Sequence, residues 1–119
     1  MIGFLRALLR RLRRGTPEPA LVVSDAGVTL LDGDRPCDRF AWSEVREIAT
    51  FKRDFGTWDD IRLAFRLDDG WVEVSEESEG WSSLTSALES HFPTIPPDWY
   101  RAVMLPPFET CYRVLYRGD

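Results

Sequence analysis

Residues 60–75 read DIRLAFRLDDGWVEVS. Apolar side chains alternate with polar or small ones in the first half, at Ile61, Leu63, Phe65 and Leu67. This period of two is typical of a strand with one buried face. Asp69-Gly70 is a strong signal for a two-residue hairpin turn, and residues 71–75 then alternate again. The stretch therefore predicts two antiparallel strands, 60–67 and 71–75, that pair with each other.

Shorter strands are expected before this hairpin. Residues 20–24 and 28–31 are β-branched runs separated by a turn at 25–27, and a loop follows at 32–36. Residues 38–42 lead into a longer strand at 45–53, with a single helical turn near Ser43 and Glu44 between them.

The pattern changes to a helical one after the hairpin. Trp81, Leu84, Leu88 and Phe92 recur at helical spacing. Ser78 is the expected N-cap, and Pro93 ends the helix. A short second helix is expected at 97–104, where a Pro occupies the first turn, and a last strand at 111–117.

Together these elements predict one α+β domain over residues 20–119. We expect a curved antiparallel sheet of six or seven strands, shaped as a partial barrel, with an amphipathic helix after the central hairpin and a short second helix. A chain of 119 residues has room for one such domain.

Part of the chain resembles a known class of domain. Two short strands about a turn are followed by an aromatic residue before a Trp-x-x-Val step, and the markers are Phe40, Trp42, Val45 and Ile48. With the hairpin and the helix that follow, residues 21–92 resemble small bacterial pleckstrin-homology-like domains. The step Lys52-Arg53-Asp54 is also similar to one in small bacterial proteins of unknown function. The resemblance implies a barrel-like sheet closed by a helix, used as a membrane or protein adaptor.

The N-terminus reads MIGFLRALLRRLRR and predicts a basic amphipathic helix over residues 1–15, with 16–19 as a linker. At about 100° per residue, one arc of the helix is apolar and the opposite arc is basic. The apolar arc holds Ile2, Phe4, Leu5, Leu8, Leu9 and Leu12, and the basic arc holds Arg6, Arg10, Arg11, Arg13 and Arg14. Two placements stay open. The helix docks on its own domain or on a partner, or it lies on an anionic membrane through Phe4 and the five Arg residues.

Charge is distributed unevenly along the chain. The chain has 15 basic and 20 acidic residues. Five of the basic residues lie in residues 1–14, and none of the acidic ones do. The remainder therefore holds ten basic and twenty acidic residues. A body this acidic would repel a phosphate backbone, so we expect no nucleic-acid partner and favour a basic protein partner.

No pattern in the chain predicts catalysis, a cofactor or a metal site. His91 is the one histidine, and its position in the last turn of the expected helix suits a structural role. Cys37 and Cys111 form neither a CxxC motif nor a ligand spacing with histidine, so we expect two free thiols. The paired carboxylates, such as Asp59/Asp60, are expected in turns and loops.

The sequence therefore predicts a non-enzymatic protein-binding module of bacterial type. The candidate binding residues are Lys52, Asp54, Phe55 and Trp58 around one loop, and Glu76, Glu77 and Glu79 before the helix. A specific version is an immunity-type protein that blocks a basic toxin enzyme with its acidic face. The alternative is a peripheral membrane adaptor anchored by the N-terminal helix. We expect a cytoplasmic location, with the inner-membrane surface as the alternative, and leave the oligomeric state open.

Overall fold

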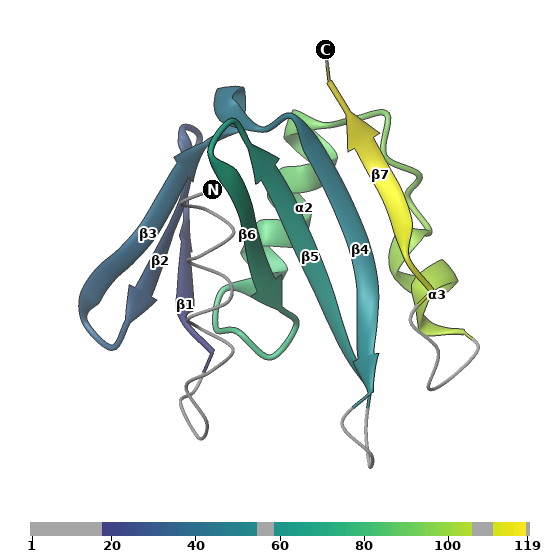
Figure 1. Ribbon diagram of the computed structural model, residues 1–119, viewed down its shortest axis with the longest axis horizontal. Coiled ribbons are helices and arrows are strands. Elements are labelled where there is room, and N and C mark those ends of the chain that lie inside the picture. The colour runs from purple at the N-terminus through teal and green to yellow at the C-terminus, as the bar shows by residue number, and fades with distance from the viewer. Residues whose placement is uncertain (1–17, 55–58, 106–110, 119) are drawn as a thin grey trace.

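The computed structural model describes residues 18–54, 59–105 and 111–118. Most of these residues belong to strands (Figure 1). The elements in chain order are β1 (Ala20–Val23), β2 (Gly27–Asp32), β3 (Arg35–Ala41), the 3₁₀ turn η1 (Trp42–Glu44), β4 (Glu47–Asp54), β5 (Asp59–Leu67), β6 (Gly70–Ser75), α2 (Trp81–His91), α3 (Trp99–Met104) and β7 (Arg113–Arg117). The chain is thus α+β, as predicted.

The strands form two antiparallel sheets, ordered β1-β2-β3 and β6-β5-β4-β7. The expectation of one curved sheet is therefore wrong. The break lies between β3 and β4, where η1 turns the chain. Trp42 at the start of this turn is buried, and its indole N–H donates to the carbonyl of Ser24 at 3.0 Å. This side chain anchors the corner between the two sheets.

The hairpin predicted from residues 60–75 is confirmed. β5 and β6 pair antiparallel, with Phe65 opposite Val72 and Leu63 opposite Val74. The turn lies one residue earlier than expected. Leu67 pairs with Gly70, so Asp68 and Asp69 form the turn. Gly70 has a φ of 136°, a conformation that favours glycine, and it occupies the first position of β6.

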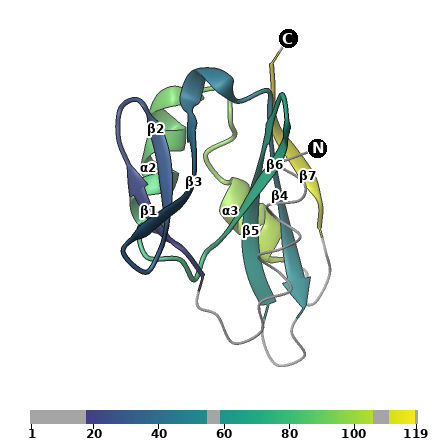
Figure 2. The same cartoon turned by 60° about the vertical axis from the view of Figure 1, so that its left-hand side comes forward.

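The four-stranded sheet has two different faces. Helices α2 and α3 both lie on one of them, which we call the inner face (Figure 2). The inner face carries the apolar side chains of β5 and β6, and these are buried with residues of β2, β3 and α2 in one core. The opposite, outer face carries the alternate residues of β4, β5 and β6, and many of these are charged.

Both helices that follow the hairpin are present. α2 buries Leu84 and Leu88, as the helical spacing predicted. It begins after Gly80, which has a φ of 93°, and no side chain caps it, so the prediction of Ser78 as N-cap is wrong. The backbone of Gly80 lies against the carbonyl of Leu21, where a Cβ would come within 2.2 Å of the oxygen. A glycine is required there by conformation and by space.

The C-terminal strand prediction also holds, since β7 pairs antiparallel with β4 at the edge of the larger sheet. The basic helix expected at residues 1–15 lies outside the described residues. So does most of the linker expected at 16–19, of which Glu18 and Pro19 are described.

Replacing Phe65 tests the orientation of β5. Its side chain is fully buried on the inner face, and its ring lies 4.8 Å from that of Phe40. We expect Phe65→Ala to lower the free energy of unfolding by about 3–5 kcal/mol in denaturant melts, as other large-to-small changes in a core do. Val22→Ala is the control, because Val22 is half exposed and should cost under about 0.5 kcal/mol. A loss below about 1 kcal/mol for Phe65→Ala would contradict this orientation.

Candidate functional site

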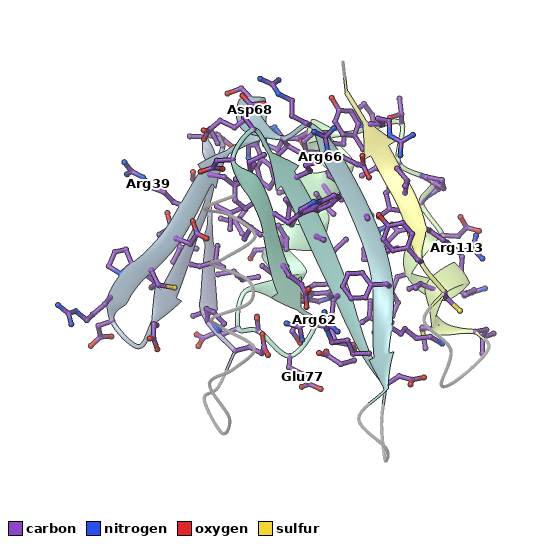
Figure 3. The ribbon with its side chains drawn as sticks, in the orientation of Figure 1. Arg39, Arg62, Arg66, Asp68, Glu77 and Arg113 are labelled. Atoms are coloured by element: carbon purple, nitrogen blue, oxygen red, sulfur yellow. The ribbon has the colours of Figure 1, made fainter. Side chains whose placement is uncertain are left out.

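A cluster of ion pairs centred on Arg62 lies on the outer face of the larger sheet (Figure 3). The guanidinium contacts three carboxylates from separate segments. Its Nη1 lies 2.5 Å from Asp60 Oδ2, its Nη2 lies 3.1 Å from Glu18 Oε1, and its Nε pairs with Glu73. Because the side chains of Arg62, Asp60 and Glu73 are all buried, this is a charge cluster in a largely dry place.

Two further contacts extend the cluster across the sheet. Glu73 also accepts a forked pair of hydrogen bonds from Arg53, at 3.0 Å from Nε and 2.9 Å from Nη2. Asp60 accepts a hydrogen bond from the hydroxyl of Ser75 at 2.6 Å. Forked arginine–carboxylate pairs are strong and directional, so they hold the side chains of β4, β5 and β6 in a fixed arrangement.

The carboxylates keep Arg62 charged. Burial alone would lower the pKa of this guanidinium, but the negative charges of Glu73, Glu18 and Asp60 outweigh that effect and raise the pKa of Arg62. A buried charge is tolerated only when it is paired and hydrogen-bonded. The carboxylates of the cluster therefore neutralise the charge of Arg62 and allow the fold to bury it.

Carboxylates gather around this cluster at one end of the molecule, which we call the acidic end. We define it by the carboxylates of Glu18, Asp59, Asp60, Glu73, Glu76, Glu77 and Glu79 and the cations of Lys52, Arg53 and Arg62. Among the side chains that the structure describes, seven negative charges thus meet three positive ones at this end. The segment before α2 is tied to the sheet here, since the Glu77 amide donates to Ser75 Oγ at 3.0 Å and the Leu21 amide donates to the Glu79 carbonyl at 2.8 Å.

The three predicted glutamates have different surroundings. Glu76 is half-buried and accepts hydrogen bonds from the Ile61 amide at 2.6 Å and from the Tyr100 hydroxyl at 3.0 Å. Burial, and then this hydrogen bond, raise the pKa of Tyr100. Glu77 and Glu79 are exposed. Glu76 therefore joins α3 to the sheet, whereas Glu77 and Glu79 lie at the surface.

Lys52, predicted to flank the binding loop, lies in β4, within the strand expected at 45–53. Its side chain is on the inner face and is buried. The ammonium donates to the carbonyl of Met104 at 2.8 Å and lies 3.6 Å from Asp59. Lys52 therefore joins β4 to the end of α3, and we leave it out of the binding surface.

The other predicted site residues are described only in part. Asp54 is the last residue of β4, and the structure does not describe its side chain. Phe55 and Trp58 lie outside the described residues, as do Phe4, Arg6, Arg10, Arg11, Arg13 and Arg14. Since β4 ends and β5 begins at the acidic end, the connection 55–58 starts and finishes there.

Sequence reasoning missed the centre of the cluster. The carboxylate pair Asp59/Asp60 was expected in a loop at the start of the strand at 60–67, but both residues belong to β5, which begins at Asp59. Arg62 was counted only as a polar residue on the exposed side of a strand. The signal that could have identified the cluster is the pairing register, which places Arg53 opposite Asp60. That register becomes readable only when the strand ends are known.

A shallow cleft of about 450 Å³ lies elsewhere, between the β1–β2 turn and α2. Its lining includes Asp25, His91 and a row of serines on α2. His91 stacks on Trp42 with ring centroids 4.8 Å apart, which fits the packing role expected for it. Among the described residues, no group of three or more potential ligands could hold a metal ion.

No protein-family model, curated protein or solved structure matches the chain. Within the described ranges, neither helix has the length and hydropathy that a membrane crossing requires.

Removing the central charge tests the cluster. We expect Arg62→Met to lower the free energy of unfolding by about 3–5 kcal/mol, because it leaves buried carboxylates without their counter-charge. Arg62→Lys should lower the free energy of unfolding by less than Arg62→Met does. Lysine keeps the positive charge but cannot make the forked pair of hydrogen bonds of a guanidinium. The control is Arg39→Met at an exposed position on β3. Denaturant melts in which Arg62→Met costs no more than Arg39→Met would refute a structural role for the cluster.

The contact between Tyr100 and Glu76 gives a prediction with a pH dependence. Tyr100→Phe should cost about 1 kcal/mol at pH 7, since one Glu76 oxygen loses its donor. The folded pKa of Tyr100 is raised, so this contribution is full below about pH 10 and is lost as the pH rises further. The difference in free energy of unfolding between the parent chain and the variant should therefore become smaller above about pH 10. Tyr112→Phe, at an exposed site, is the control, and a constant gap would contradict the assignment.

Proposed function

We propose that the chain is a non-enzymatic protein-binding module that takes a basic partner at its acidic end. The observation that carries the proposal is the exposure of Glu77 and Glu79 beside a cluster in which, among the described residues, seven carboxylates meet three cations. An acidic surface attracts a basic protein, accelerates its approach and repels nucleic acid. The net charge of the whole chain, −5, has the same sign.

The exposed carboxylates stand on a fixed backbone. Glu77 and Glu79 flank Ser78, whose amide donates to the Ser75 carbonyl at 3.0 Å. Gly80 then turns the chain into α2 against Leu21. A partner that pairs with these glutamates would not need to order a loose loop first, which lowers the entropic cost of binding.

The aromatic loop belongs to the same proposal. Phe55 and Trp58 belong to the connection that joins the end of β4 to the start of β5. Aromatic anchors beside a charged rim are a common composition of protein interfaces. In the immunity-like version, the acidic end blocks the basic surface of a toxin enzyme. A cytoplasmic location is part of this proposal, whereas the pleckstrin-homology-like resemblance stays a prediction on which the proposal does not depend.

Charge reversal at the two exposed glutamates tests the proposal. Tagged chain would capture partners from an extract of the source cells, and each captured protein would be purified and titrated by calorimetry. We expect a basic protein that binds about tenfold more weakly to the double variant Glu77→Lys/Glu79→Lys, because each exposed pair contributes up to about 1 kcal/mol. Glu76 stays unchanged, since its loss would disturb α3.

The matched control is Asp34→Lys/Glu89→Lys, which makes the same change in net charge at exposed positions outside the acidic end. It should bind the partner nearly as tightly as the parent chain. Equal weakening by both double variants would show that net charge alone matters. Unchanged binding by Glu77→Lys/Glu79→Lys would reject the acidic end as the site.

A further inference from the structure

The strand β7 has a partner strand on one side only. It is the last strand in the order β6-β5-β4-β7 and pairs with β4 along Arg113–Arg117 (Figure 1). No other described strand pairs with it. Alternate residues of an antiparallel strand direct their amide and carbonyl groups away from the partner strand. β7 therefore presents a backbone edge, which we call the open edge, to which a further strand could form hydrogen bonds.

Apolar side chains beside the open edge are exposed. Tyr112 is 56 % exposed, Leu105 is 64 % exposed and Val114 is 41 % exposed, and Met104 is also exposed. The Cys111 Sγ lies 3.7 Å from the carbonyl oxygen of Leu105, so the residue that follows α3 lies beside the start of β7. Of the five large apolar side chains that are exposed among the described residues, four belong to these two segments. Such a concentration of exposed apolar side chains is typical of an interaction surface.

The side chains at the start of β7 alternate between the two faces of the sheet. Val114 lies opposite Ala49 on the outer face, and Tyr112 stacks on Phe51 there, with ring centroids 6.3 Å apart. Arg113 lies between them in the sequence and therefore on the opposite face. The open edge thus presents an apolar, a basic and an apolar residue in turn. An added strand would match it with apolar side chains on the outer face and an acidic one on the inner face.

The charge of β7 differs from that of the other described strands. β7 contains two arginines and no carboxylate, whereas every other described strand with a charged residue contains at least one carboxylate. Glu47 lies 3.3 Å from Arg117 and offsets its charge. Arg113 is exposed, lies on the side of β7 away from β4 (Figure 3), and has no carboxylate partner among the described residues. An acidic side chain on an added strand would supply that partner.

We propose that the open edge of β7 binds an extended, acidic segment of a partner protein as an additional strand of the larger sheet. Backbone hydrogen bonds to β7 hold the segment, its apolar side chains pack on Tyr112 and Val114, and a carboxylate pairs with Arg113. This inference goes beyond the proposed function, which places a basic partner at the carboxylates before α2. The two sites have opposite charge and are tested separately.

The arginines of β7 determine which kind of strand can bind. Native proteins protect exposed sheet edges with proline, bulges or charged side chains. β3, an outer strand of the smaller sheet, contains Pro36 and has a register shift in its pairing with β2. β7 also has a register shift but no proline, so its protection depends on Arg113 and Arg117. These charges repel a basic strand, or a second β7 that would bring two more arginines, but they attract an acidic strand.

A synthetic strand tests the proposal in the full chain. The probe is a capped, fluorescein-labelled peptide of four Val-Glu repeats, titrated by fluorescence anisotropy. We expect saturable binding to the parent chain and about tenfold weaker binding to Arg113→Glu, because the variant replaces an attraction with a repulsion. Arg39→Glu, the same change at an exposed position on β3, is the matched control and should bind nearly as tightly as the parent chain. Equal affinities of the two variants, or no saturable binding up to about 1 mM peptide, would overturn the proposal.

Two further peptides distinguish strand addition from attraction between charges alone. One has the Val-Glu sequence with N-methyl groups on every central residue, which removes the amide donors and keeps the charge. We expect it to bind at least about tenfold more weakly than the unmodified peptide, because a strand is held by backbone hydrogen bonds. The other has four Val-Lys repeats and should bind Arg113→Glu more tightly than Arg39→Glu. Full binding of the N-methylated peptide, or no preference of the Val-Lys peptide, would reject strand addition at Arg113.

A second copy of the chain is the alternative occupant of the open edge. Sedimentation equilibrium of the parent chain without peptide reports it. We expect a monomer at the concentrations used for the titrations, because two β7 strands repel each other. A dimer that the Val-Glu peptide dissociates would assign the open edge to a second copy and overturn the proposal.

Discussion

The structure depends on the pairing of Arg62, a permanent positive charge held almost out of water on a sheet face. Such a charge is stable only if carboxylates surround it, and here they come from Glu18, Asp60 and Glu73. The contact with Glu18 joins residues 44 positions apart. One guanidinium thus fixes the relation of β5 to β6 and the point at which the N-terminal chain meets the sheet.

The acidic end follows from the same constraint. Carboxylates that neutralise Arg62 and Arg53 must lie near the start of β5 and the end of β6, and the turn into α2 adds Glu76, Glu77 and Glu79 beside them. Of these three glutamates, Glu76 accepts hydrogen bonds from Ile61 and Tyr100 within the domain. The other two face solvent. The exposed Glu77 and Glu79, where we propose that a basic partner binds, therefore lie beside the cluster that the fold requires.

Much of the fold could be predicted from the sequence because it depends on local periodicity. The alternation around Phe65 predicts the β5–β6 hairpin, and the helical spacing of Leu84 and Leu88 predicts α2. The split into two sheets could not, because it depends on a corner held by the distant contact from Trp42 to Ser24. The contact that Lys52 makes could not be predicted for the same reason, since its partner Met104 lies 52 residues away. The cluster around Arg62 required the strand register, which the sequence left uncertain by one residue at the turn.

The central claim is that the carboxylates around Arg62 hold its charge in a buried position. The side-chain Nε–H of Arg62, which pairs with Glu73, reports this directly, since its NMR signal survives at neutral pH only where the proton exchanges slowly with water. We expect a sharp, slowly exchanging signal in the parent chain and much faster exchange in a folded Glu73→Ala variant. Equal exchange in the two proteins would contradict this claim.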